Sequence, residues 1–318
     1  MLKVSAEGGN CVDAKIRKPG NLWARILRNK WVYILFFPAF VFMCVFNYAP
    51  LYGLSIAFKD FKPFIGIADS EWVGFYHFST IINDPKFYTL LWNTVKISTL
   101  RILFTMPVPI IFALLVNEVR SRWFKKTVQA INYFPFFLSW VVFYGIIYGF
   151  TGPSGAINQT LQNLGMEKIN LTTNKDAFIP MLLITDLIKN MGWSSIVYMA
   201  SISGIDAQLY EACAIDGGGK LRQIWHVTLP GMRGIICFQY CMAVANILNA
   251  GFDQIFMFMN GTLLEVGDIF DTYIYRMGLL NSNYEISTAM GMMKGLVGMV
   301  MIITANKITR KIGEKSLW

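Results

Sequence analysis

The stretch DAQLYEACAIDGGGKLRQIWHVTLPGMR, residues 206–233, is a polar island between two long apolar runs. Its first part, 207–215, is compatible with a short helix, and the aspartate before it is a suitable N-cap. Three glycines, 217–219, stop that helix and permit a sharp turn. Residues 221–227 can form a second short helix, which Leu229-Pro230 is expected to end. The pattern predicts a compact helix–turn–helix unit.

The apolar runs on either side of this unit are long enough to cross a bilayer, which takes about 20 mostly apolar residues. The clearest run in the chain is 31–58, which contains no charged residue. The run after it contains Lys96 and Arg101, whose long side chains are expected to reach toward the interface. The sequence predicts six membrane-spanning helices: 31–58, 90–116, 128–150, 178–202, 234–259 and 286–306.

Composition agrees with a membrane protein. Of the 318 residues, 55% are hydrophobic and 15% are charged, whereas soluble domains carry about 25% charged residues. The net charge of +9 does not indicate nucleic-acid binding, because the basic residues cluster between apolar runs and the aromatic residues lie inside those runs. The lipid bilayer is the expected surrounding, and the chain is expected to be a multi-pass, all-α membrane protein.

The distribution of Lys and Arg predicts the orientation. Eighteen of the 28 basic residues fall in the N-terminal segment, the second and fourth connections and the C-terminal tail, against six in the other three connections. Basic residues favour the cytoplasmic side, so both termini are predicted to be cytoplasmic. The predicted organisation is a basic cytoplasmic tail (1–30) followed by a six-span domain (31–318), with an outer segment at 59–87 and a cytoplasmic loop at 206–233.

The cytoplasmic loop resembles a known motif. Glu211-Ala212-Cys213, Gly217 and Val227-Thr228-Leu229-Pro230 are similar to the EAA loop of permease subunits of ABC importers, which has Glu-Ala-Ala, a Gly six residues after the Glu, and Ile-x-Leu-Pro. Cys213 replaces the second Ala, and Val227 replaces Ile. LYEACAIDGGG and TLPGM resemble the carbohydrate-importing branch. NYAPLYGLSIAFKDFKP (47–63) and WVGFYHF (72–78) resemble its polysaccharide and complex-oligosaccharide permeases.

The resemblance implies a type I ABC importer permease fold, in which the EAA loop docks on a separate ATPase subunit and moves with it. By that resemblance, Glu211 makes the charged contact and Gly217 makes the tight turn. The alternative to this contact is that Glu211 is an ordinary loop carboxylate exposed to solvent. The residues assigned to ATPase coupling are Glu211, Ala212, Asp216, Gly217, Leu229 and Pro230.

The sequence contains no pattern for a nucleotide site. A P-loop needs G-x-x-x-x-G-K-[ST] to hold phosphate, but Gly218-Gly219-Lys220 is followed by Leu221 and lacks the earlier glycine. With two histidines and no HExxH or GxSxG motif, no catalytic residue and no metal site is predicted. The chain is expected to be a transport subunit that binds no cofactor, with ATP and Mg on the partner ATPase.

Polar residues inside the predicted spans are the candidates for a substrate pathway, since such residues usually face a bundle interior or an aqueous path. The fourth span carries a stripe at i, i+3, i+4 and i+7, and the fifth carries one at i, i+3 and i+7. Either stripe could instead hold helices together, for example through an Asp186–Lys189 pair. The candidates, with one aromatic residue of the third span, are Tyr133, Asp186, Lys189, Asn190, Trp193, Asn246, Asn249 and Asp253.

The favoured function is therefore the permease subunit of an ATP-driven importer of oligosaccharides or polysaccharide fragments. Its expected partners are ATPase subunits, a second and non-identical permease, and an extracytoplasmic solute-binding protein. The outer segment at 59–87 is expected either to meet that binding protein or to form a small lid that packs on its own spans. A secondary transporter or channel is disfavoured because the sequence contains no internal repeat. An intramembrane enzyme is disfavoured by the lack of catalytic motifs.

Overall fold

The computed structural model describes residues 29–311, so almost all of the predicted basic tail (1–30) lies outside the described residues. The chain divides into two units, residues 1–55 and residues 56–318. The described part of the first unit is helical: α2 (Lys30–Met43) continues through a π turn, η1 (Cys44–Tyr48), into η2 (Ala49–Phe58). No residue of α2 is buried, and a helix that is apolar on all faces is typical of a membrane span.

The second unit is mostly helical and begins with a small lobe. In this lobe β1 (Lys59–Asp60) pairs antiparallel with β2 (Glu71–Trp72), in the register Lys59 to Trp72. The Lys59 ammonium donates to the carbonyl of Ala68 at 3.0 Å, and Trp72 stacks on Phe58. These contacts give the predicted outer segment an ordered structure. The lobe also contains α3 (Gly66–Asp69) and α4 (Tyr76–Asn83).

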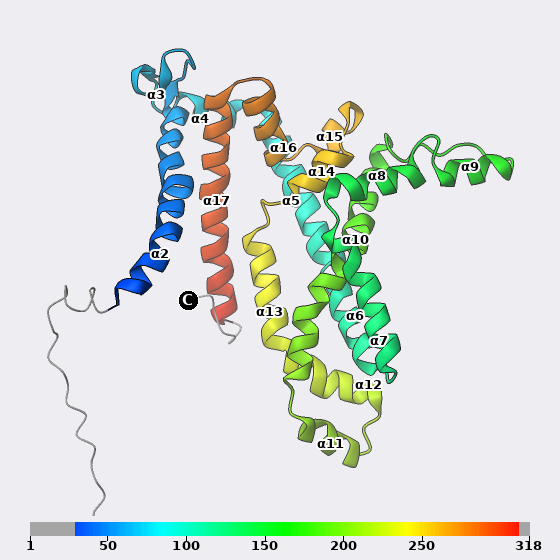
Figure 1. The fold of residues 1–318 in the computed structure, drawn as a ribbon. Coiled ribbons are helices and arrows are strands. Elements are labelled where there is room, and N and C mark those ends of the chain that lie inside the picture. The colour runs from blue at the N-terminus through cyan, green and yellow to red at the C-terminus, as the bar shows by residue number, and fades with distance from the viewer. Residues whose placement is uncertain (1–28, 312–318) are drawn as a thin grey trace, which may run out of the picture. The chain divides into compact units, whose positions relative to one another are not determined.

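The remaining helices of the second unit form the predicted membrane domain, and Figure 1 shows α11 and α12 at the end opposite α14, α15 and α16. Their bounds are α5 (Pro85–Phe104), α6 (Pro107–Glu118), α7 (Arg122–Tyr133), η3 (Phe134–Phe137), α8 (Trp140–Thr151), α9 (Ala156–Asn163), α10 (Lys175–Ser203), α11 (Ala207–Ile215), α12 (Lys220–Gln223), η4 (Ile224–Thr228), α13 (Leu229–Ala245), α14 (Phe252–Phe258), η5 (Gly261–Leu263), α15 (Leu264–Gly267), α16 (Phe270–Tyr275), η6 (Arg276–Leu280) and α17 (Tyr284–Lys311).

Four described helical stretches are long and apolar enough to cross a membrane: Lys30–Phe58, Pro85–Glu118, Lys220–Ala245 and Tyr284–Lys307. The pair Arg122–Phe137 and Trp140–Asn163 makes a fifth if it counts as one span. The predicted fourth span corresponds to α10, which has 29 residues. It is not among the five, since Asp186, Lys189 and Asn190 lower its mean hydropathy.

Two predicted spans differ from the structure because the backbone breaks inside them. The predicted third span, 128–150, bends by 106° between η3 and α8. The predicted fifth span, 234–259, is interrupted after Ala245, and the chain is irregular until α14 begins. At this second break Gly251 has φ +88°, a left-handed conformation that β-carbon-bearing residues rarely adopt.

Helix α10 lies at the centre of the second unit, against α6, α7 and α13. Phe178, Leu182 and Tyr198 are among its fully buried side chains. At Gly192 a β-carbon would lie 2.2 Å from the backbone oxygen of Asn132, so the backbones of α10 and α7 are in direct contact. The glycine is required there because no side chain fits between the helices.

Arg101 differs from its predicted orientation toward the interface. Its guanidinium donates to Gln254 of α14 and contacts the backbone at Gly251, where a β-carbon would lie 2.2 Å from Nη1. Gln254 is itself buried and donates to the backbone oxygen of Leu182 at 2.8 Å. The half-buried Arg101 thus joins α5 to the beginning of α14, whereas Lys96 on the same helix is exposed.

Candidate functional site

Helix α11 is a short, well-capped helix. The Asp206 side chain accepts a hydrogen bond from the backbone N–H of Gln208 at 3.0 Å, as predicted for the N-cap. At the other end, Gly218 N–H donates to Cys213 O at 2.8 Å and Gly217 N–H donates to Ala214 O at 3.0 Å. This pair of bonds is a Schellman motif, with Gly217 at φ +76° in the left-handed position that ends the helix.

The three consecutive glycines are not equivalent. Gly217 needs its positive φ. Gly218 has negligible space, because a β-carbon would lie 2.5 Å from Cys213 Sγ and 2.6 Å from Cys213 O. Gly219 has an ordinary φ of −71° and open space around it, and it begins α12. The predicted sharp turn is therefore confirmed, and the first two glycines account for it.

The second half of the loop differs from the prediction. Leu229-Pro230 was expected to end a short helix, but Lys220–Ala245 is one continuous helical stretch. In the π turn η4, the N–H of Leu229 donates to the oxygen of Ile224, five residues back. A proline inside an α-helix clashes with the carbonyl four residues earlier and lacks an N–H. The wider π turn just before Pro230 relieves this conflict.

Side-chain contacts brace α11 against the helix that follows it. The hydroxyl groups of Tyr210 and Thr228 are 3.1 Å apart, and Thr228 is buried. Gln223 also donates to the backbone oxygen of Tyr210, at 3.4 Å. Lys220 forms an ion pair with Glu118 at the end of α6, at 3.2 Å. The loop is thus held as one body rather than as a loose connection.

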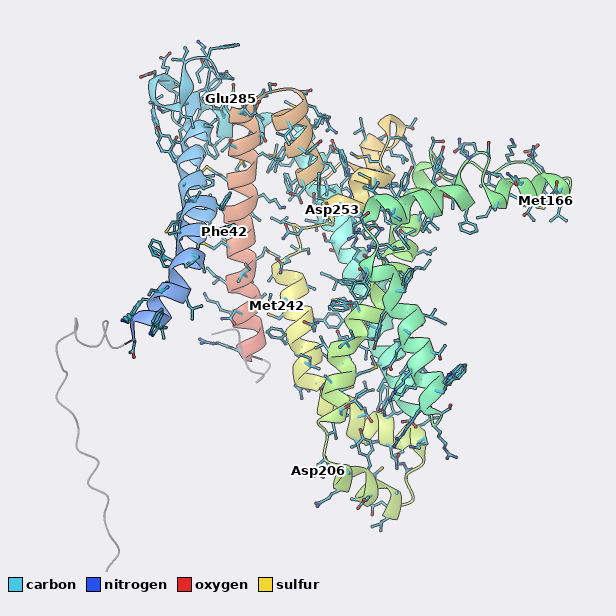
Figure 2. The ribbon with its side chains drawn as sticks, in the orientation of Figure 1. Phe42, Met166, Asp206, Met242, Asp253 and Glu285 are labelled. Atoms are coloured by element: carbon cyan, nitrogen blue, oxygen red, sulfur yellow. The ribbon has the colours of Figure 1, made fainter. Side chains whose placement is uncertain are left out.

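The outer face of this loop is exposed and combines acidic and apolar groups (Figure 2, near Asp206). Within the described part of the chain, the Glu211 carboxylate makes no hydrogen bond and no ion pair. Large apolar side chains of the same loop are also exposed: Ile215 is 86% exposed, Leu221 84% and Trp225 70%. An exposed apolar patch with a free carboxylate is suited to a protein partner.

The polar residues of α10 make different contacts from those considered above. Asp186 accepts a hydrogen bond from Asn190 at 2.8 Å, and the alternative Asp186–Lys189 pair is wrong. The Lys189 ammonium instead donates to the backbone oxygens of Pro135 at 3.1 Å, Phe136 at 3.0 Å and Leu138. Lys189 is buried, with 4% of its surface exposed.

Aromatic residues surround these groups. Trp193 stacks on Phe136 with ring centres 4.4 Å apart and planes 3° from parallel. Tyr133, at the end of α7, lies against Gln129 and Ser195. A pocket of about 460 Å³ opens beside the stack and includes polar groups of three segments, Ser139, Asn190 and Asp253, next to Phe136 and Trp140. The apolar ring faces suit the C–H groups of a sugar, and the hydroxyl, amide and carboxylate groups suit its hydroxyl groups.

The predicted stripe on the fifth span is wrong as a helix face. Helix α13 ends at Ala245, so Asn246 and Asn249 lie in the break, where Asn249 donates to Asn246 at 3.3 Å. Asp253 lies beyond the break in the first turn of α14. Asn246 and Asn249 line a second groove of about 680 Å³ with Lys294, separate from the pocket that includes Asp253.

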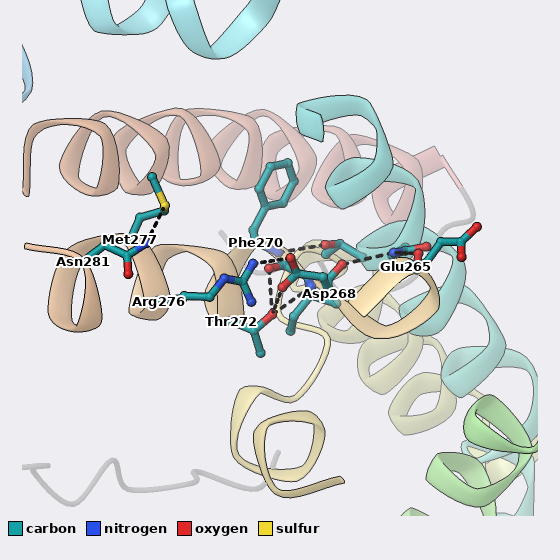
Figure 3. A network of polar contacts seen from close by, with 10 residues as sticks. Glu265, Asp268, Phe270, Thr272, Arg276, Met277 and Asn281 are labelled. Atoms are coloured by element: carbon teal, nitrogen blue, oxygen red, sulfur yellow. Dashed lines mark hydrogen bonds and ion pairs between the residues drawn. The ribbon is translucent and has the colours of Figure 1, made fainter. Parts of the chain in front are cut away.

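A polar network in the connection between α14 and α17 was not predicted (Figure 3). Buried Asp268 accepts hydrogen bonds from Thr272, at 2.8 Å, and from Arg276. Asn93 of α5 donates to the backbone oxygens of Glu265 and Asp268, at 2.9 and 3.2 Å. These bonds attach the connection to α5. The spacing Asp-x-x-x-Thr-x-x-x-Arg is the signal in the sequence for such a network.

Two further ion pairs belong to the same region. Lys294 of α17 forms an ion pair with Asp271 of α16. Lys175 at the beginning of α10 pairs with Glu265, and its hydrogen bond and charge lower the pKa of the exposed Glu265 carboxyl. Both pairs tie a long helix, α17 or α10, to the connection.

Comparison with known proteins agrees with this arrangement. Residues 105–314 match the family described as "Binding-protein-dependent transport system inner membrane component". The polygalacturonan/rhamnogalacturonan transport system permease protein YteP of Bacillus subtilis is 38% identical over the full length of both chains. Protein LplB of the same organism is also 38% identical, over 93% of each chain.

Solved structures give the same result. The crystal structure of a bacterial ABC transporter involved in import of the acidic polysaccharide alginate contains a chain that is 35% identical, with a TM-score of 0.84 over 92% of this chain and 99% of that one. A bacterial alginate ABC transporter bound to an alginate pentasaccharide-carrying periplasmic protein matches at 34% identity with the same TM-score, over 93% and 99%. The chain belongs to the family of binding-protein-dependent inner membrane transport components, as a multi-pass permease subunit of an ABC importer.

Proposed function

We propose that the chain couples ATP hydrolysis on a separate subunit to the import of oligosaccharides. Helix α11 is the contact with the ATPase: it is short, capped at both ends and braced through Tyr210 and Thr228. A push on such a body moves it as a whole. The free Glu211 carboxylate and the exposed apolar side chains beside it supply the contact chemistry. This rigid, exposed loop is the observation that carries the proposal.

The proposed orientation follows from the same loop. With α11 in the cytoplasm and six crossings, counting α10 and the bent α7–α8 pair as spans, both termini are cytoplasmic. This agrees with the excess of Lys and Arg on that side of the predicted topology. The ATP and Mg sites belong to the ATPase, and this chain has no resident cofactor.

The proposed assembly contains two permeases, this chain and a non-identical one, two ATPase subunits and an extracytoplasmic solute-binding protein. The alginate transporter bound to its periplasmic protein supports the last of these partners. The names of the similar proteins refer to polygalacturonan, rhamnogalacturonan and alginate. Fragments of acidic polysaccharides are therefore the first substrates to test.

The proposed path for the sugar runs past the pocket at Asn190 and Asp253 and the groove at Asn246 and Asn249. Amide groups lie in the linings of both hollows, and the pocket also contains the Asp253 carboxylate. A sugar needs such hydrogen-bonding groups together with aromatic faces. Trp193 and Tyr133 are not lining residues of either hollow, but Trp193 stacks on Phe136, which lines the pocket. Lys189 lines the pocket, but its donors are taken by three backbone oxygens, so it has a supporting role. Asp186 accepts one hydrogen bond from Asn190 and lines a smaller hollow with it, so it stays a candidate for the path.

The test is co-purification. The tagged chain is extracted from its host in mild detergent, as wild type, as Glu211→Ala and as Glu167→Ala, which removes an exposed carboxylate at the far end of the second unit. We expect an ATPase subunit and a second permease with the wild type and with Glu167→Ala. With Glu211→Ala the second permease stays while the ATPase is reduced about tenfold or more, as for loss of one contact charge. A wild-type chain that remains folded but brings no ATPase contradicts the proposal.

A further inference from the structure

At the break between η3 and α8, no backbone N–H of the described residues donates to the oxygens of Phe136 and Leu138, whereas the oxygen of Pro135 accepts from the N–H of Leu138 at 3.2 Å. Lys189 is the side chain that reaches all three oxygens. Its ammonium donates to the oxygens of Pro135, Phe136 and Leu138. An ammonium has three donors, so these three bonds use all of them. None is left for a hydroxyl or carboxylate of a substrate.

The surroundings of the ammonium agree with a fixed, structural cation. It lies over the rings of Phe136, Trp140 and Phe143, at 5.8, 5.3 and 5.8 Å from the ring centres. No carboxylate lies within ion-pair distance of it among the described residues. Buried carbonyl oxygens are costly to leave without a donor, so the ammonium stabilises this conformation of the segment.

The segment that Lys189 holds is also a wall of the 460 Å³ pocket. Phe136, Leu138, Ser139 and Trp140 all line it. Phe136 is held on two sides: its carbonyl accepts from Lys189, and its ring lies on Trp193 at 4.4 Å. The direction of two aromatic rings in the pocket therefore depends on one buried side chain of α10.

We infer that Lys189 is a positioning residue for sugar binding, which acts by fixing the aromatic wall formed by Phe136 and Trp140 and not by touching the sugar. This inference rests on the proposed transport of oligosaccharides and adds a role to the pocket. Lys189 lines the same pocket as Asn190 and Asp253. It differs from them because all three of its donors are engaged by backbone oxygens.

The test compares uptake kinetics of the complete importer in proteoliposomes, with solute-binding protein, ATP and short radiolabelled oligogalacturonates; alginate pentasaccharide is the second probe. Lys189→Met removes the donors and keeps a similar length. We expect KM to rise by about tenfold or more, the factor for loss of a charge-assisted hydrogen bond, with the maximal rate within about twofold. Lys96→Met, at an exposed lysine of α5, serves as the control and keeps the wild-type KM.

A double-mutant comparison identifies the route of the effect. If Lys189 acts through the wall, Phe136→Leu in the Lys189→Met background raises KM no further than the larger single change, whereas independent contributions multiply. An unchanged KM in Lys189→Met, a lower maximal rate alone, or multiplying effects would overturn the inference.

Assembly is measured for each variant, so that a folding defect is not mistaken for a binding defect. If Lys189→Met does not assemble, Lys189→Gln replaces it: its shorter amide reaches only part of the carbonyl set, and KM is expected to rise about threefold or more. A wild-type KM for Lys189→Gln would overturn the inference. Absence of uptake by the wild-type importer with both probes would instead count against the proposed function.

Discussion

Replacing Gly218 by alanine should weaken coupling through a calculable clash. The added β-carbon would lie 2.6 Å from Cys213 O, a backbone atom that cannot rotate away. The last turn of α11 must therefore open, which removes the Gly218–Cys213 and Gly217–Ala214 hydrogen bonds, of 2.8 and 3.0 Å. At about 0.5–1.5 kcal/mol for each bond, the docking-competent loop loses about 1–3 kcal/mol.

That loss sets the size of the effect on the ATPase contact. Each 1.4 kcal/mol is about tenfold in population, so the apparent Kd for the ATPase should rise by about five- to 150-fold. The assay is binding of the purified ATPase subunit to the permease complex in nanodiscs, together with sugar-stimulated ATP hydrolysis. Insertion and assembly are expected to stay normal, since the turn lies outside the apolar helices.

Gly219→Ala is the matched control. Gly219 has an ordinary φ and no atom within 4 Å of an added β-carbon, so this variant should bind the ATPase as the wild type does. Equal affinities for wild type and Gly218→Ala would refute the reasoning, and so would equal losses in Gly218→Ala and Gly219→Ala.

Three other perturbations have defined outcomes. Asn158→Asp replaces a 1% exposed amide that donates to two backbone oxygens with a carboxylate that cannot donate; the region around α9 should become protease-sensitive, at a cost of about 2 kcal/mol or more. Gly192→Ala forces α10 away from the α7 backbone and should lower Tm by several degrees, measured by unfolding in detergent. The Lys175–Glu265 ion pair lowers the pKa of Glu265 in the folded chain, so its stabilisation should be complete above the unfolded pKa of Glu265 and should disappear as pH falls through the lower, folded pKa. Loss of the ion pair should be seen as faster amide exchange in α15.

Controls separate each of these from a general effect. Asn170→Asp changes an exposed residue in the same connection and should leave proteolysis unchanged. Gly291→Ala meets no atom within 4 Å, so its Tm should equal that of the wild type. Lys175→Met should remove the pH dependence of exchange in α15; persistence of that dependence in Lys175→Met would show that another group titrates.

The sequence was sufficient to predict the parts of the fold that local chemistry determines. The Asp206 cap, the turn at Gly217 and the charge-free run 31–58 depend on residues that lie next to one another in the chain, and the structure has all three. The family was predictable for the same reason, because its motif is a local pattern of spacing and residue type.

The breaks inside the third and fifth predicted spans could not be predicted by hydropathy, because neither break contains a charged residue. What stabilises the breaks comes from elsewhere in the chain: Lys189 donates to the carbonyls at the first, and Arg101 lies against Gly251 at the second. Pro135 and Gly251 were the available local signals. The helix-face argument for Asn246 and Asn249 failed because it assumed that the helix continued.

The π turn before Pro230 also affects how far a movement of the proposed coupling loop can be transmitted. An ordinary break at that proline would insert a joint between α11 and the membrane. Because the 26 residues Lys220–Ala245 are continuous, they form a lever of about 39 Å at 1.5 Å per residue. A tilt of about 5° about one end then displaces the other end by about 3 Å over that length. This displacement is about the width of one water molecule, and it occurs next to the two asparagines that follow Ala245.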